Sequence, residues 1–92
     1  MNIPVTVKQN KTRAERLTIR NRMVAARFFY WSEIKRRRFD DCFAILENDE
    51  FFIDFQTIKI AISSQQVYLD ELYVTSKVAT FLKKQYPSWN WN

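Results

Sequence analysis

The fold is decided by residues 11–38, which read KTRAERLTIRNRMVAARFFYWSEIKRRR. This stretch contains neither proline nor glycine, so nothing in it interrupts a helix chemically. Thr12 is suited to the N-cap, because its hydroxyl can accept a hydrogen bond from a free main-chain N–H of the first turn. We therefore predict one long helix that begins after Thr12 and reaches Arg38, with a break near Ser32.

Apolar side chains of this helix fall into two bands when successive residues are placed 100° apart. One band holds Leu17, Val24, Phe28 and Trp31, and the other holds Ile19, Met23, Ala26, Tyr30 and Ile34. Between them runs a basic stripe of Arg13, Arg20, Arg27 and Arg38, with Arg16 beside it. Each apolar band must be covered, so the helix is expected either to be central in its own domain or to form a homodimer.

Four shorter helices are expected after the first. They cover approximately residues 39–47, 55–63, 65–73 and 77–86. Asn48 is the residue suited to a left-handed position at the end of the second helix. Asp54 is expected to cap the third helix and Thr75 or Ser76 the fifth, which Pro87 ends. A strand over residues 51–62 is the alternative, because apolar and polar residues alternate loosely there.

Composition favours an all-α fold class, a small bundle of four or five helices with a long first helix. Hydrophobic residues make up 47% of the 92-residue chain, and glycine, which β-hairpin turns favour, is absent. This length predicts a single domain over residues 1–92. Residues 1–11 are expected to form a flexible N-terminal arm. Residues 87–92 form a tail whose Trp89 and Trp91 fold back on the core or anchor a partner.

Positive charge is concentrated in the first part of the chain. Residues 1–38 hold 11 lysines and arginines against two glutamates, a net charge of +9, whereas residues 39–92 carry four lysines against eight carboxylates, a net charge of −4. Arginine dominates, and its planar fork suits phosphate. The predicted phosphate-binding residues are Arg13, Arg16, Arg20, Arg27, Lys35, Arg36, Arg37 and Arg38.

Several kinds of chemistry are excluded by residue types that the sequence lacks. Histidine and glycine are absent and Cys42 is the single cysteine, which excludes hydrolytic triads, zinc clusters and glycine-rich phosphate loops. The nearby carboxylates Asp40, Asp41, Asp49, Glu50 and Asp54 suggest a magnesium site, but helix capping explains most of them more simply. We expect no enzyme activity, no cofactor and no metal.

The location expected from the sequence is cytoplasmic. The chain has no apolar run of membrane-spanning length, and residues 1–13 lack the apolar core of a signal peptide. A lone cysteine fits a reducing compartment. No membrane partner is therefore expected.

Residues 38–64 resemble the helix-turn-helix of small bacterial DNA-binding proteins and of the N-terminal or accessory parts of transposases. The residues that carry the resemblance are Phe43, Leu46, Phe52, Ile53, Asp54, Thr57, Ile58 and Ile62. It implies that the helix beginning near Phe55 lies in the major groove and presents Gln56, Lys59 and Ser63 to the bases. A glutamine is suited to an adenine edge. The connector departs from the usual pattern, because it is longer and lacks glycine.

These observations predict a non-catalytic nucleic-acid-binding protein whose partner is double-stranded DNA. One alternative is a helical interaction module whose basic stripe pairs with an acidic partner or whose first helix forms a homodimer. Another is binding of RNA or single strands by the run from Arg27 to Trp31, where aromatic rings follow an arginine. This second alternative requires those rings to be exposed.

Overall fold

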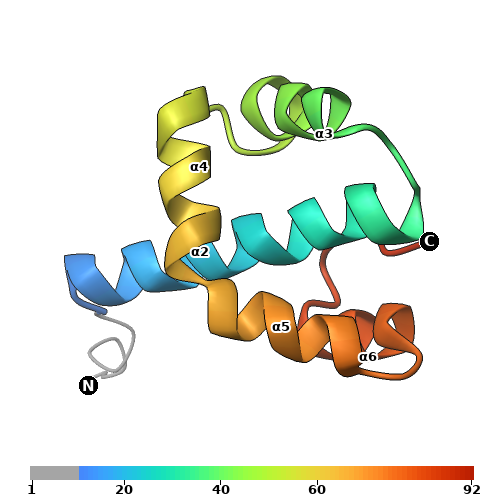
Figure 1. Cartoon of the computed structure of the whole chain (residues 1–92). Helices are drawn as coiled ribbons and strands as arrows, with labels where there is room; N and C mark the ends of the chain where they lie inside the picture. Colours follow the sequence, from blue (N-terminus) through green and yellow to red (C-terminus); the bar gives the residue numbers. More distant parts are fainter. Residues whose placement is uncertain (1–10) are drawn as a thin grey trace, which may run out of the picture.

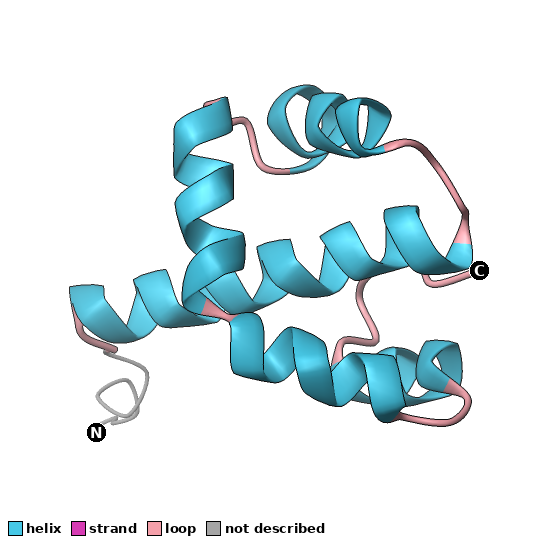
Figure 2. Ribbon diagram, in the orientation of Figure 1, coloured by secondary structure: helices cyan, strands magenta, loops and turns pink. Residues whose placement is uncertain are grey.

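The computed structural model describes residues 11–92, which form five helices and contain no strand (Figures 1 and 2). Helix α2, Arg13–Phe29, continues into a π-helical turn η1, Tyr30–Ile34, and α3, Phe39–Ile45, continues likewise into η2, Leu46–Glu50. The remaining helices are α4, Phe55–Ser64, α5, Gln66–Val74, and α6, Val78–Gln85. The all-α prediction is confirmed, and the alternative of a strand over residues 51–62 is wrong. The arm predicted for residues 1–11 lies outside the described residues except for Lys11.

Helix α2 begins with the cap that the sequence predicts. The Thr12 hydroxyl accepts from the Glu15 main-chain N–H at 3.1 Å, and the Glu15 carboxylate accepts from the Thr12 main-chain N–H at 2.8 Å. This reciprocal pair satisfies two donors that a helix start otherwise leaves free.

The first helix ends earlier than predicted, at Ile34 instead of Arg38. The expected break near Ser32 is a π turn, in which the Ser32 hydroxyl donates to the Phe28 carbonyl at 2.8 Å. Arg36 then adopts a left-handed conformation with φ of 60°, which turns the chain toward α3. Residues 35–38 therefore form a connector, and Arg38 does not continue the helical stripe.

Helix α2 lies in the middle of the fold, with α3 and α4 on one side and α5 and α6 on the other (Figure 1). On the first side, Val24 and Phe28 pack in a cluster with Cys42, Leu46, Ile58 and Ala61. On the second side, Ala26 and Tyr30 pack in a cluster with Tyr68, Leu69, Leu72, Leu82 and Trp91. From Met23 onward the two predicted bands are thus covered by different pairs of helices, whereas Ile19 of the second band is 47% exposed, and α2 is the central helix of its own domain.

Two further connections, at Phe52 and Lys77, adopt left-handed backbone conformations that the sequence did not predict. Asn48 lies inside η2, and Phe52, with φ of 57°, is the residue that turns the chain toward α4. Lys77, with φ of 52°, precedes α6 without any side-chain cap, so the caps predicted at Thr75 and Ser76 are wrong. Asp54, by contrast, caps α4 as predicted, because its carboxylate accepts from the Thr57 main-chain N–H at 2.8 Å.

The tail after α6 folds back onto the core, which was the first of the two alternatives predicted for Trp89 and Trp91. Trp91 is 2% exposed and donates its indole N–H to the Tyr86 carbonyl at 2.8 Å. Trp89 stacks on Phe51, with ring centroids 5.4 Å apart. The tail therefore connects the α6 side of the fold to the segment that follows η2.

Candidate functional site

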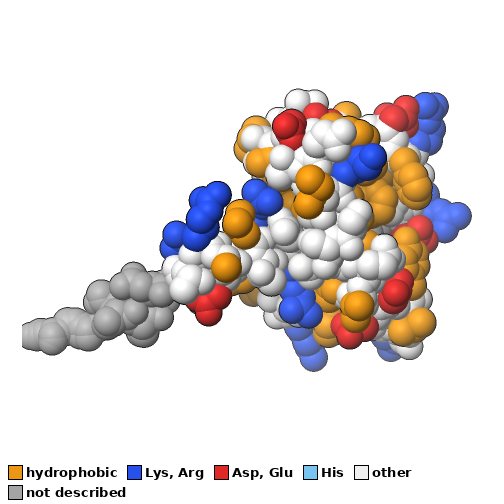
Figure 3. Space-filling view, turned by 60° about the vertical axis from the view of Figure 1, so that its left-hand side comes forward, with side chains coloured by type: hydrophobic (Ala, Val, Ile, Leu, Met, Phe, Trp, Pro, Cys, Tyr) orange, Lys and Arg blue, Asp and Glu red, His pale blue; other side chains and the backbone are white. Residues whose placement is uncertain are grey.

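The N-terminal end of α2 extends past the position where α4 crosses the helix (Figure 1). We call residues 11–22 the projecting segment. Most of its side chains are exposed, whereas the seven residues from Val24 to Tyr30 are all buried. The projecting segment carries five cations against one carboxylate, a net charge of +4. Figure 3 shows Lys and Arg side chains on this end of the molecule.

Three predicted phosphate-binding arginines lie on one side of the projecting segment. Arg13, Arg16 and Arg20 fall within about 60° of one another around the helix axis. Arg16 donates Nη1–H to the Lys11 carbonyl at 2.7 Å, and Arg20 donates to the Asn21 side-chain oxygen from Nε at 3.1 Å and from Nη2 at 2.8 Å. Within residues 11–92, none of the three guanidinium groups lies within 4 Å of a carboxylate.

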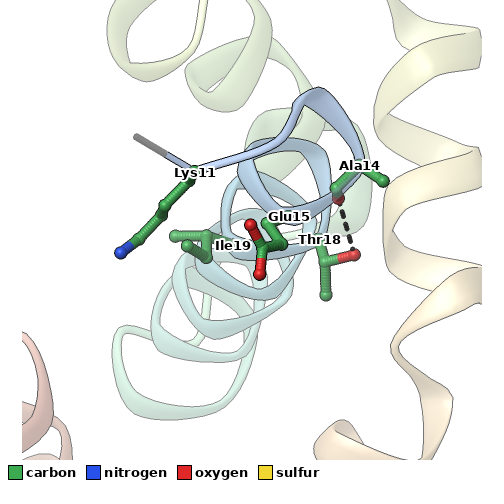
Figure 4. A pocket seen from close by; sticks show the side chains of 5 residues that line it. All are labelled: Lys11, Ala14, Glu15, Thr18 and Ile19. Carbon is green, nitrogen blue, oxygen red and sulfur yellow. Dashed lines mark hydrogen bonds between the residues drawn. The ribbon is translucent and has the colours of Figure 1, made fainter. Parts of the chain in front are cut away.

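The opposite side of the projecting segment is a shallow hollow without concentrated positive charge (Figure 4). It is lined by Lys11, Ala14, Glu15, Thr18 and Ile19. The Thr18 hydroxyl donates to the Ala14 carbonyl at 3.0 Å, and hydrogen bonds from the main chain and side chain of Thr12 lower the pKa of Glu15. The single carboxylate of the segment is thus ionised, engaged in the cap and directed away from the arginine side.

The connector of residues 35–38 forms a second basic region, at the other end of the first helix. All four cations are exposed. Lys35 donates to the main-chain oxygen of Asn92, and Arg37 lies over the Trp31 ring at 5.9 Å from its centroid. Arg38 forms an ion pair with Asp40 at 2.7 Å, which lowers the pKa of that carboxyl. Part of the positive charge of this region is therefore balanced locally.

Arg27 is not available to phosphate, which corrects its prediction as a phosphate-binding residue. It is 3% exposed, and it binds the Glu50 carboxylate through Nε at 2.9 Å and Nη2 at 2.6 Å. Its Nη1 donates to the Asn90 carbonyl. Four aromatic rings surround the guanidinium carbon at 4.5 to 5.5 Å from their centroids; they belong to Tyr30, Trp31, Trp89 and Trp91. Arg27 has a structural role between α2, η2 and the tail.

The aromatic run that follows Arg27 is also part of the core. Phe28, Phe29 and Tyr30 are buried, and Trp31 is half-buried with its indole N–H donating to Glu50 at 3.1 Å. These rings therefore offer no stacking surface, which removes the basis for single-strand or RNA binding at this position.

The three residues predicted to read bases are exposed together on α4. Gln56, Lys59 and Ser63 lie on the side of the helix opposite the buried Ile58 and Ala61. The Lys59 ammonium lies 5.6 Å from the centroid of Phe55. This surface holds one cation, that of Lys59, and one nearby carboxylate, that of Asp54. Hydrogen bonds from Thr57 lower the pKa of Asp54 and so favour its ionised form. It therefore lacks the concentrated charge of the projecting segment.

Three of the five carboxylates that suggested a magnesium site have other roles. Asp40 pairs with Arg38, Glu50 with Arg27, and Asp54 caps α4. In the part of the chain that the structure describes, no group of three potential metal ligands comes together. Cys42 is buried in α3, and burial raises the pKa of its thiol. Residues 11–92 also include no helix with the length and apolar character needed to cross a membrane.

The chain matches no protein-family model, no curated protein and no solved structure. Its function is therefore argued from its own side chains.

Proposed function

We propose that this protein binds nucleic acid without catalysing a reaction, and that its partner is double-stranded DNA. The observation that carries the proposal is the arrangement of exposed Arg13 and Arg16 and half-buried Arg20 on one side of a projecting helix, with no carboxylate of residues 11–92 paired to them. Arginines at the surface that lack an internal carboxylate partner retain their capacity to bind an external anion, and a polyphosphate backbone supplies such anions at regular spacing.

Charge distribution over the fold supports this choice of surface. Arg27 and Arg38 are the described cations that form ion pairs with carboxylates, and both lie outside the projecting segment. Of the other twelve described cations, eight lie at the two ends of the first helix, in the projecting segment and in residues 35–37. These regions contribute the phosphate contacts in our proposal.

Helix α4 has a secondary place in the proposed interface. Helices α3 and α4 and their connector follow the helix-turn-helix order, and Gln56, Lys59 and Ser63 are exposed on the second helix. In this proposal they approach the duplex beside the projecting segment, and Lys59 adds one more cation. The carboxylate of Asp54 opposes a closer approach of phosphate to the start of α4.

A salt titration tests the proposal. A labelled 20-base-pair duplex is titrated with protein at 50 to 200 mM potassium chloride, with fluorescence anisotropy as the readout. The three contacts of the projecting segment alone predict a slope of about −2.7 in the logarithm of affinity against the logarithm of salt, so the whole interface should lose about 40-fold or more in affinity across this range. Absence of binding at 50 mM, or an affinity independent of salt, refutes the proposal.

A pair of charge-matched variants assigns the contact surface. R13Q/R16Q/R20Q removes three charges from the projecting segment, and K77Q/K83Q/K84Q removes three exposed charges from the α6 region. Only the first variant is expected to reduce the salt slope by about 2.7. An equal effect of both variants would mean that net charge alone attracts the DNA.

The second candidate is an interaction module, which the exposure of one apolar side chain favours. Ile19 is 47% exposed and lines the hollow of the projecting segment. If this segment pairs with a copy of itself, light scattering will give a dimer mass that I19E converts to a monomer mass. A monomer at all concentrations removes this candidate.

A further inference from the structure

We infer that the projecting segment enters the major groove of B-form DNA, so that α2 and not α4 is the helix that contacts base edges. The inference rests on the proposed function, and it identifies the form of nucleic acid and the part of the duplex that this site binds. It differs from the helix-turn-helix assignment, in which α4 occupies the groove.

The size and surroundings of the projecting segment fit a groove. An α-helix with its side chains is about 10–12 Å across, and the major groove of B-DNA is about 12 Å wide. Residues 13–22 form about 15 Å of helix, and no other helix lies alongside their outer turns (Figure 1). The inner turn is packed, since Arg22 lies over the Tyr68 ring of α5 and Arg20 is half-buried, so the outer turns are the part that is free to enter the groove. Helix α4 does not project in this way, because it packs against α2 and α5 follows it directly at Gln66.

The chemistry of the segment also fits a groove floor between two phosphate walls. Arg13, Arg16 and Arg20 share one side, so they face the DNA together, and an arginine fork can bind the O6 and N7 atoms of guanine or a phosphate oxygen. Asn21 holds the Arg20 fork in place through two hydrogen bonds. The single carboxylate, that of Glu15, belongs to the cap and the opposite side.

Groove entry predicts a preference between duplex forms. The major groove of A-form RNA is too deep and narrow for a helix to reach the bases, whereas its phosphate charge is like that of DNA. Contact with the backbone alone would therefore treat the two duplexes alike. Entry into the groove predicts binding to duplex DNA at least tenfold tighter than to an RNA duplex of the same sequence.

A duplex with a filled major groove gives the direct test. Four probes of one sequence, each 20 nucleotides per strand, are titrated: duplex DNA, the same duplex with glucosylated 5-hydroxymethylcytosine, duplex RNA and single-stranded DNA. The C5 substituent occupies the major groove and leaves the phosphates in place. We expect the modified duplex to bind at least tenfold more weakly than the plain duplex. Equal affinities for these two would overturn groove entry while leaving DNA binding intact, and no binding to any probe would refute the proposed function itself.

A bulky substitution on α4 tests which of the two helices, α2 or α4, enters the major groove. S63W adds an exposed indole to the outer side of α4 without changing the charge. If the projecting segment occupies the groove, S63W still binds the plain duplex at least tenfold more tightly than the modified duplex, while R13Q/R16Q/R20Q loses this discrimination. Loss of discrimination in S63W, with discrimination retained in the arginine variant, would assign the groove to α4 and overturn the inference.

Discussion

Replacing Arg27 by methionine tests whether the buried ion pair with Glu50 holds the two halves of the fold together. The guanidinium is 3% exposed, binds Glu50 through two hydrogen bonds and lies among four aromatic rings. In R27M the carboxylate of Glu50 stays in this environment and retains one partner, the Trp31 indole N–H. An unpaired buried charge is the main reason to expect a large effect.

The expected loss of stability follows from that geometry. Removal of one partner of a buried ion pair costs about 3–5 kcal/mol. Cation–π contacts contribute about 0.5–2 kcal/mol more, but the methionine side chain replaces part of the packing. We therefore expect R27M to lose about 4 kcal/mol, which is more than a quarter of the roughly 5–14 kcal/mol typical of a chain of this length.

Urea denaturation followed by tryptophan fluorescence measures this loss where it occurs, because Trp31, Trp89 and Trp91 all surround Arg27. With an m-value near 2 kcal/mol per molar, the urea midpoint of R27M falls by about 2 M. Arg22 provides the control, since it lies 4.4 Å from the centroid of Tyr68 but is exposed and forms no ion pair within residues 11–92. R22M should lose less than about 1 kcal/mol.

The double variant R27M/E50Q completes the test. It removes both charges and keeps an acceptor for the Trp31 indole, so it should be at least about 2 kcal/mol more stable than the sum of the single variants predicts. Strict additivity, or an R27M midpoint within about 0.3 M of the unaltered protein, would show that the pair does not hold η2 and the tail against α2.

Three substitutions at single positions, each followed by urea denaturation, test other parts of the fold. W91A, at a side chain 2% exposed in the core, should lose about 3–5 kcal/mol in the same urea assay, and W91F clearly less. F52N should gain about 1 kcal/mol, because the left-handed φ of 57° is costly for a phenylalanine and the ring is 74% exposed. Because the folded-state pKa of Asp54 is lowered, its cap stabilises the fold above the pKa of an unfolded aspartate and is lost as the pH falls through the folded value. D54N, which caps without titrating, should therefore show a smaller fall in urea midpoint between about pH 5 and pH 2.

Periodicity and capping chemistry predicted most of the fold. The two apolar bands of α2 are covered by separate clusters, and Thr12 and Asp54 cap the helices assigned to them. These features are local, since a hydroxyl or carboxylate at a helix start acts on residues two or three positions away. The left-handed residues were missed, because Phe52 and Lys77 have side chains that disfavour this conformation and only tertiary packing holds them there.

The candidate site was predicted in part, and Arg27 shows why. A helical stripe places Arg27 in line with Arg13 and Arg20, but periodicity gives only the direction of a side chain and not whether another element lies above it. A signal was present in the neighbouring residues, since Arg27 stands inside the otherwise apolar run from Met23 to Trp31. An arginine surrounded on all sides of its helix by apolar residues is enclosed with them, and such a buried cation requires a partner.

Helix α2 therefore both forms the centre of the core and holds the three arginines of the projecting segment on one side, and the second depends on the first. An isolated helix of about 12 residues is marginal in water, because nucleation is costly. The projecting segment is helical because it continues from seven consecutive buried residues and begins with the Thr12–Glu15 cap. The core on both sides of α2 fixes the direction in which the helix leaves the globule, and so it holds Arg13, Arg16 and Arg20 on one side. Burial of Arg27 removes one cation from the surface but fixes the inner end of the helix that presents the other three.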